Sequence, residues 1–392
     1  MDSLLDITAE QRKVMEELKK RTIQDVTPKM LEDEFLFYRF CKACDFNLSD
    51  SETMLRKHIT FRKQMNMDDR NYKPPEVLEK YVPTSYVCFD KDGSVVRYSD
   101  IGQADIKAFW KCVTKMEMLK FLMMQIEYDT DLLNLQSKKL GKPLMNIVYI
   151  FDYNHFSLAV ATHLQTLQNL LFFLKNYVDN YPERLKCGMI INGSIYYNLV
   201  FNVAKSILPA TIIKKLPCYG TEGWKEALLE MVDTDQLPAF LGGNRTDPDG
   251  NPLCETFLKH GKKVPEMYYR SISNKQLPLA SDIEKLTLRP FSKEGILFKV
   301  NEDDLLLEWE FETKNKDVGF ALYFQEDSRQ EGKPAQLIPM QRVDTCYEPE
   351  KGMIRCNGRG TYIVVFDNSY SWIHTKEIYY RIRLVNPDEV EN

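Results

Sequence analysis

The sequence lacks any apolar run long enough to cross a membrane. No stretch of its 392 residues approaches the roughly 18 apolar residues of a spanning helix, and Met1–Asp6 lacks the basic start and apolar core of a signal peptide. The net charge of −5 does not point to nucleic acid, whose binders tend to be basic. Nine cysteines, an odd count without regular spacing, favour reduced and mostly buried thiols in the cytosol over a disulfide scaffold.

Common catalytic motifs are also missing. There is no GxSxG elbow, no Walker A loop and no HExxH. Cys41 and Cys44 have the spacing of half a zinc site, but no second pair or matching histidines accompany them. We therefore expect no metal, no cofactor and no catalytic residue. A hydrolase that uses His155 and Asp152 stays open as an alternative, although no activated nucleophile is evident near them.

What the sequence does contain falls into three zones, and its length exceeds what one hydrophobic core usually supports. Residues 1–75 are typical of helices. Thr8 and Gln11 form a capping-box pattern, and further helices are predicted over residues 28–40 and 49–64. A pair of prolines ends this zone.

Residues 76–250 alternate between strand and helix signals. Asp90–Gly93 lies between two apolar runs and predicts a hairpin. Residues 146–151 and 188–191 lack period-two alternation and are expected to be strands buried on both faces. Helices are predicted over residues 116–135 and 159–181. Strands separated by helices indicate a mainly parallel sheet.

Residues 265–388 lose the helix signals after a strong turn cluster at residues 246–251. Short strand patterns separated by turns predict a β-sandwich here. The expected strands are residues 295–300, 305–312, 318–324, 360–366 and 378–384.

The segment Ile195–Leu208 is apolar around most of its circumference. Such a helix must be buried, cover a cavity or meet lipid. Lys214 and Lys215 follow it and have two interpretations. They either form a solvated helix end or contact a phosphate at the mouth of a lipid pocket or on an anionic membrane.

Several of these segments together resemble the CRAL-TRIO lipid-binding family. The N-terminal run from Tyr38 to Gln64, the IFD of residues 150–152, NYPERLK at residues 180–186 and LPAFLGG at residues 237–243 occur in the family's order. Segments of the tail, such as FDNSYSWIHTKEIYY at residues 366–380, resemble the GOLD β-sandwich. The resemblance implies a Sec-fourteen-like carrier with an α/β fold. Its parts would be a helical module, a CRAL-TRIO sheet with a gate helix, and a GOLD domain.

The resemblance also implies which residues form the site. The gate would lie near residues 195–213, over a cage floored by residues 146–151. The expected pocket and gate residues are Ile147, Tyr149, Phe151, Tyr197, Val200, Phe201, Ala204, Ile207, Leu208 and Ile212.

In members that bind phosphatidylinositol, a glutamate and a lysine contact the headgroup, and Glu183 and Lys215 match their positions. Hydroxyl residues hold the phosphate there, whereas this chain has Ile147 and Tyr149 at the matching positions. This departure favours an uncharged ligand such as tocopherol, squalene or a retinoid over a phosphoinositide.

The expected function is that of a non-catalytic cytoplasmic carrier, peripheral to membranes. It would take a hydrophobic lipid from one membrane surface and transfer or present it to another. No nucleic-acid partner is expected. The alternative is a lipid-tuned adaptor that recruits a protein partner through the GOLD domain.

Overall fold

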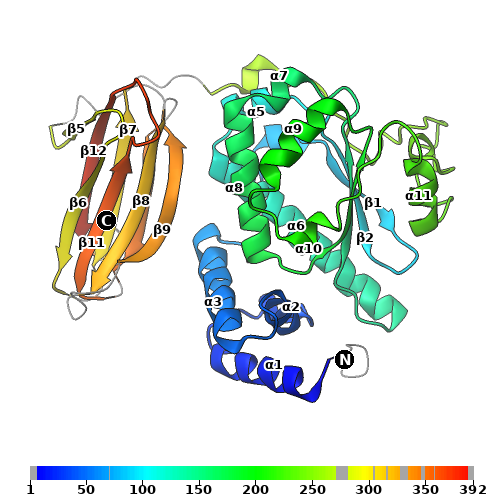
Figure 1. Ribbon diagram of the computed structural model, residues 1–392, viewed down its shortest axis with the longest axis horizontal. Coiled ribbons are helices and arrows are strands. Elements are labelled where there is room, and N and C mark those ends of the chain that lie inside the picture. The colour runs from blue at the N-terminus through cyan, green and yellow to red at the C-terminus, as the bar shows by residue number, and fades with distance from the viewer. Residues whose placement is uncertain are drawn as a thin grey trace. The chain divides into compact units, whose positions relative to one another are not determined.

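The computed structural model describes residues 7–69, 71–270, 281–302, 305–314, 317–326, 334–345, 349–356 and 358–386. Contacts divide the chain into two compact units, Met1–Tyr269 and Arg270–Asn392. The first consists of helices around a small sheet, and the second is built from β-strands (Figure 1).

The first unit begins with three helices, α1 (Ala9–Thr22), α2 (Leu36–Ala43) and α3 (Leu48–Met65). The predicted capping box is confirmed. The Thr8 hydroxyl accepts a hydrogen bond from the Gln11 N–H, and the Gln11 side chain accepts one from the Thr8 N–H. The three helices share a small apolar core that includes Leu18, Phe40 and Leu55, all fully buried.

The predicted helix over residues 28–40 is wrong. A single 3-10 turn, η1 (Met30–Glu32), stands in its first half, and α2 starts only at Leu36. Asp33 explains the break. Its backbone is extended (φ −85°, ψ 99°), and its carboxylate accepts a hydrogen bond from the Phe35 N–H at 3.1 Å. A short polar side chain that bonds its own backbone in this way competes with helix formation.

The sheet of the first unit has the order β1-β2-β3-β4. Its strands are β1 (Thr84–Phe89), β2 (Val95–Asp100), β3 (Ile147–Asp152) and β4 (Leu185–Ile191). β1 and β2 form the expected antiparallel hairpin, whereas β2, β3 and β4 are parallel. The prediction of a mainly parallel sheet is therefore confirmed.

Helices connect the parallel strands, because parallel neighbours need a long crossover connection. Between β2 and β3 lie α5 (Ile106–Cys112) and α6 (Lys115–Leu140), and between β3 and β4 lie α7 (Leu158–Ala161) and α8 (Leu164–Asn180). The other elements of this unit are α4 (Glu76–Tyr81), α9 (Ile195–Ala204), α10 (Ala210–Ile213), α11 (Trp224–Met231), η2 (Ala239–Leu241) and η3 (Glu266–Tyr268).

One helix was expected over residues 159–181, and the structure has two. The Thr162 hydroxyl donates a hydrogen bond to the Leu158 carbonyl at 2.9 Å, and α7 ends there. His163 has extended backbone angles and precedes α8. The break lets α8 start in a new direction, alongside α9, with which it is in contact.

The two faces of β3 have different surroundings because side chains alternate along a strand. Val148 and Ile150 face a dry core that includes Leu228 of α11. Ile147 and Tyr149 face the other way, toward α6 and α8. We expected burial on both faces, but Tyr149 and Phe151 keep accessible surface.

The second unit is a sandwich of two four-stranded antiparallel sheets, ordered β10-β7-β12-β5 and β6-β11-β8-β9. Its strands are β5 (Glu284–Leu288), β6 (Lys293–Val300), β7 (Leu306–Thr313), β8 (Asp317–Glu326), β9 (Ala335–Asp344), β10 (Glu350–Arg355), β11 (Gly360–Asp367) and β12 (Lys376–Val385). The five predicted strands are confirmed, and β5, β9 and β10 were missed. Phe311, Phe320 and Phe366 are fully buried between the sheets.

Candidate functional site

The apolar segment after β4 leaves the edge of the sheet and returns to the same place. The N–H groups of Asn192 and Gly193 donate hydrogen bonds to the carbonyls of Gly220 (3.0 Å) and Tyr219 (2.9 Å). On the return, the Gly188 N–H donates to the Lys215 carbonyl at 2.8 Å. Both ends of the segment are therefore fixed, and residues 194–214 form a flap between them.

Within the flap, the continuous apolar segment expected over Ile195–Leu208 is divided. α9 starts after Ser194, whose side chain accepts a hydrogen bond from the Tyr196 N–H, and it ends at Ala204. Pro209 precedes the short helix α10. Because proline has no N–H and fixes its own φ, it is favoured before a new helix and not inside one. The flap is thus two helices joined by a bend.

The flap is held in place by apolar contacts. Across the described part of the chain, no hydrogen bond or ion pair joins residues 195–214 to another element. Apolar contacts are not directional, so such a segment can shift without leaving broken hydrogen bonds behind. This is the physical requirement for a gate.

One face of α9 is turned inward. Tyr197, Val200 and Ala204 are buried, and Leu208 continues this face beyond the helix. The Tyr197 ring lies 4.9 Å from that of Tyr153, which follows β3. Phe201, Ile207 and Ile212 are half-buried. Four of the seven predicted gate residues are thus buried, and the ring of the half-buried Phe201 stacks with that of Tyr197.

The outer side of the flap exposes apolar side chains to solvent. Ile195 is 75% exposed and Leu199 is 45% exposed. Leu158 of α7 and Leu164 of α8 are 48% and 63% exposed, and both helices contact α9. We call these four leucine and isoleucine side chains the outer patch.

Beneath the flap, α8 has an unusual burial pattern. A helix that packs on a sheet normally buries a continuous apolar stripe. On α8 only Asn169 and Asn180 are buried. The apolar side chains Leu167, Leu170, Leu171, Phe172, Phe173, Leu174, Tyr177 and Val178 all remain partly accessible.

The floor opposite α8 shows the same pattern. Tyr149 and Phe151 of β3 stack with ring centroids 5.6 Å apart, and both are half-buried. Burial nevertheless raises the pKa of Tyr149 well above its ordinary value, and the pKa of Tyr177 on α8 is raised for the same reason. A phenol cut off from bulk water resists ionisation. Both phenols are therefore largely surrounded by protein, although each keeps some accessible surface.

Ile147 has the same orientation as Tyr149 but different surroundings. It is fully buried, packed under α6 in a cluster with Leu119, Ile126 and Leu133. At the start of β3 the floor is therefore filled by protein side chains. On this face of β3, accessible surface begins at Tyr149, two residues further along the strand.

The two predicted headgroup residues lie together. Glu183 sits in the turn before β4 with φ +58°, and its carboxylate lies 4.0 Å from the Lys215 ammonium. Lys42 of α2 approaches the same carboxylate, at 3.3 Å. The sequence alone does not point to Lys42, because nothing local to residue 42 shows that α2 packs beside the turn. Lys214, the other candidate lysine, is exposed.

The NYPERLK segment has a structural explanation. Arg184 is buried and donates to Asp33, which also binds Arg39. Lys186 donates to Asp90 and Asp92 in the hairpin turn, at 2.6 Å each. This segment therefore ties the N-terminal helices and the β1–β2 hairpin to β4.

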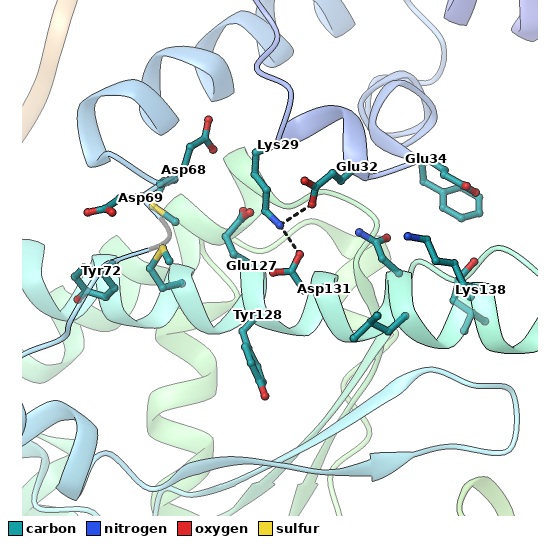
Figure 2. Close-up of a pocket in the computed structure, with 17 residues that line it drawn as sticks. Lys29, Glu32, Glu34, Asp68, Asp69, Tyr72, Glu127, Tyr128, Asp131 and Lys138 are labelled. Carbon is teal, nitrogen blue, oxygen red and sulfur yellow. Dashed lines mark hydrogen bonds and ion pairs between the residues drawn. The ribbon is translucent and has the colours of Figure 1, made fainter.

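Away from the flap, an open cleft of about 610 Å³ lies between α6 and the N-terminal segments, as Figure 2 shows. Acidic side chains dominate its wall, but many of them are engaged inside the protein. Lys29 binds both Glu32 and Asp131, and Arg62 binds Glu127 at 2.5 Å. We interpret this cleft as a seam between packed elements.

The residues of the alternative catalytic and metal interpretations have other partners or surroundings in the structure. Asp152 accepts hydrogen bonds from Tyr98 (3.1 Å) and Asn192 (2.8 Å), so its carboxylate is engaged in holding loops. His155 is exposed on the following turn. Burial raises the pKa of Cys41 to about 11, which disfavours a thiolate ligand. Over the described ranges, no group of three or more metal-ligating side chains occurs, and no helix is long and apolar enough to span a membrane.

Comparison with known proteins places these features in context. Residues 62–243 match the CRAL/TRIO domain, and residues 325–385 match the GOLD domain model described as Golgi-dynamics membrane-trafficking. Protein ctg-1 of Caenorhabditis elegans is 24% identical over 376 residues, which are 94% of this chain and 96% of that protein. Sec14 cytosolic factor of Schizosaccharomyces pombe is 30% identical over 236 residues, 57% of this chain and 79% of that protein.

Two further likenesses are more limited. Protein real-time of Aedes aegypti is 25% identical over 299 residues, which cover 73% of this chain but 44% of that protein. The crystal structure of Sfh5 matches with a TM-score of 0.49 and 17% sequence identity. The match covers 70% of this chain and 99% of the Sfh5 chain.

The CRAL/TRIO match agrees with the 79% coverage of Sec14 cytosolic factor and with the sheet and its helical flap. This chain belongs to the CRAL/TRIO family of lipid-binding and lipid-transfer proteins and carries a GOLD domain after its CRAL/TRIO domain.

Proposed function

We propose that this protein is a cytoplasmic carrier that holds one hydrophobic lipid between the floor of β3 and the flap. Tyr149 and Phe151 would contact the lipid from below, and the inner face of α9 would cover it. The observation that carries this proposal is the flap itself. It is fixed at both ends and apolar on its inner face, and among the described residues no hydrogen bond joins it to another element.

The energetics suit a ligand without directional contacts. Burying roughly 300–500 Å² of apolar ligand surface contributes about 8–12 kcal/mol at ~25 cal/mol/Å². Ordering and association costs remove a large part of that gain. The remainder is sufficient for a carrier that must also release its ligand.

We infer that the ligand is an uncharged isoprenoid-like lipid of the tocopherol, squalene or retinoid class. Ile147 is sealed under α6, and Tyr149 holds the only hydroxyl at the two positions that carry phosphate-binding hydroxyls in phosphatidylinositol-binding relatives. A second ligand class is the phosphoinositides, whose headgroup could bind at Glu183, Lys215 and Lys42.

Exchange with a membrane would use the outer patch. Ile195, Leu199 and their neighbours Leu158 and Leu164 are exposed next to the flap. When the flap opens toward a bilayer, this surface would leave water together with the inner face. The protein would thus bind donor and acceptor membranes transiently, as a peripheral protein.

The test is to load purified protein with radiolabelled tocopherol from detergent and to compare two variants on one helix. Phe201→Asp places a charge on the inner side of α9 and should abolish loading. Asn202→Asp places the same charge on the exposed side and should load like the unchanged protein. Full loading of Phe201→Asp would contradict the gate assignment.

Native mass spectrometry of protein purified from its own cells identifies the lipid class. A co-purifying neutral lipid would support the first ligand class, and a co-purifying phosphoinositide would favour the second. Both variants should show unchanged far-ultraviolet circular dichroism, because neither position lies in the fully buried core.

A further inference from the structure

The second unit exposes large apolar side chains at one end of its sandwich. Trp372 and Ile373 are 80% and 81% exposed in the loop that joins β11 to β12 (Figure 1). Phe291, in the loop that joins β5 to β6, is 61% exposed, and its ring centroid lies 5.7 Å from that of Trp372. We call these three side chains the apolar tip.

The loops that carry the apolar tip are held together by one buried side chain. Asn368 is fully buried, and its amide donates hydrogen bonds to the carbonyls of Leu288, Arg289 and His374, at 3.2, 3.1 and 2.9 Å. Its backbone N–H donates to Ser292 at 2.8 Å. The tip is therefore pre-organised, and little conformational entropy is lost when something binds it.

Hydrogen bonds also close the loop on either side of Trp372 and Ile373. The Ser371 hydroxyl donates to the His374 carbonyl at 3.0 Å and accepts from the His374 N–H at 3.1 Å. A loop can approach hydrocarbon only when its polar groups are paired inside the protein or remain at the wet interface. This loop meets that condition on both sides of Trp372 and Ile373.

Basic side chains flank the apolar tip. Arg289 and Lys293 are exposed on either side of Phe291, and neither forms an ion pair with any residue that the structure describes. His374 follows Ile373 and is exposed as well. Glu294 is the exposed acid next to Lys293. Asp367, which pairs in register with Lys293 and accepts a hydrogen bond from the Ser369 N–H, is the second nearby acid.

We propose that the apolar tip inserts into the interface of an anionic lipid membrane, with Arg289 and Lys293 on the headgroups. This goes beyond the proposed carrier function and does not depend on which lipid the first unit holds. Three observations favour a bilayer over a protein partner. Its large apolar side chains are mostly exposed, its loop is held by hydrogen bonds on both sides of Trp372 and Ile373, and it combines a tryptophan with basic neighbours, which is the composition of membrane-interface anchors.

Tryptophan fluorescence tests the proposal directly, because Trp372 is the exposed one of four tryptophans. Trp110, Trp224 and Trp309 are 7%, 5% and 6% exposed. The full chain is mixed with vesicles of phosphatidylcholine and phosphatidylserine that contain brominated acyl chains. We expect a blue shift and strong quenching. Trp372→Phe should keep vesicle binding and lose that quenching, and any quenching left in it reports bromolipid taken up by the first unit.

Vesicle co-sedimentation supplies the matched comparison. Trp372→Ser should weaken binding about tenfold, since ~1.4 kcal/mol of lost apolar burial corresponds to that factor. Leu297→Ser removes a side chain that is 66% exposed on a strand of the same sandwich and should bind normally. Arg289→Ala should weaken binding to anionic vesicles and leave phosphatidylcholine vesicles unaffected.

Two results would overturn the proposal. One is equal vesicle binding by Trp372→Ser and the unchanged chain. The other is the absence of Trp372 quenching in bound protein, which would leave the tip as a surface for a protein partner. Circular dichroism of each variant confirms folding. Because Trp372→Phe separates tip insertion from lipid uptake, failure of one is distinguishable from failure of the other.

Discussion

The ammonium of Lys215 lies 4.0 Å from the carboxylate of Glu183 and donates a hydrogen bond to the Leu185 carbonyl at 2.9 Å. Lys215 is where the flap rejoins β4, and Glu183 is in the turn where β4 begins. One charge pair therefore sits at the returning hinge of the flap. A ligand phosphate that binds Lys215 would replace the Glu183 carboxylate as its nearest anion.

Lys215→Ala should therefore weaken phosphoinositide binding about tenfold or more and leave tocopherol loading unchanged. The loss reflects a charge-assisted hydrogen bond, worth about 1.5–3 kcal/mol. Lys214→Ala is the matched control, since Lys214 directly precedes Lys215 and is exposed. Equal loss of both ligands in Lys215→Ala would mean that the lysine serves the flap's structure instead.

Leu199→Ser should separate loading from transfer. Leu199 lies in the outer patch and is 45% exposed, so its change should not affect lipid taken up from detergent. Transfer between vesicles should slow several-fold, because less apolar surface is available to dock. A fluorescence assay with labelled lipid in donor vesicles measures the rate. An unchanged rate would show that membranes meet another surface.

His58 should make the protein sensitive to acid. Burial, followed by the positive charges of Arg62 and Arg39, lowers its pKa from 6.5 to about 3, against the weaker opposing effects of its Asn180 hydrogen bond and Asp33. Between these two values the unfolded chain binds a proton that the folded chain does not. Stability is therefore highest above pH 6.5 and falls with decreasing pH down to about 3.

The measurement is the free energy of unfolding by urea for the unchanged chain and for His58→Gln, from pH 7.5 to pH 5. Gln can still bond Asn180 and cannot be protonated. The advantage of the unchanged chain should shrink by up to about 1.4 kcal/mol per pH unit below pH 6.5. A constant difference across this range would show that His58 titrates normally.

Asp33→Asn should be among the most destabilising changes in the first unit. Asp33 sits between the buried guanidinium groups of Arg39 and Arg184, and their charges hold its pKa below the ordinary value. Removing one partner of a buried ion pair costs about 3–5 kcal/mol. Asp179→Asn breaks the exposed pair with Lys175 and should cost less than about 1 kcal/mol. Similar losses of unfolding free energy in both variants would contradict a buried ion-pair role for Asp33.

Elements with strong local patterns were predictable from the sequence. The Thr8 capping box, the hairpin at Asp90–Gly93 and five of the eight strands of the sandwich follow from residue spacing alone. Errors arose where a tertiary contact overrode the pattern. Asp33 breaks a helix because the distant Arg184, the nearby Arg39 and its own backbone engage its carboxylate.

The candidate site divides in the same way. The sequence by itself determined that Ile195–Leu208 is too apolar for an ordinary surface helix, and that Glu183 and Lys215 match a known headgroup pattern. Only the tertiary structure decided that both ends of the flap are fixed to one strand edge, that Ile147 is sealed while Tyr149 is accessible, and that Lys42 joins the pair. The reason is physical: composition sets how much apolar surface a segment carries, whereas packing between distant elements decides what that surface faces.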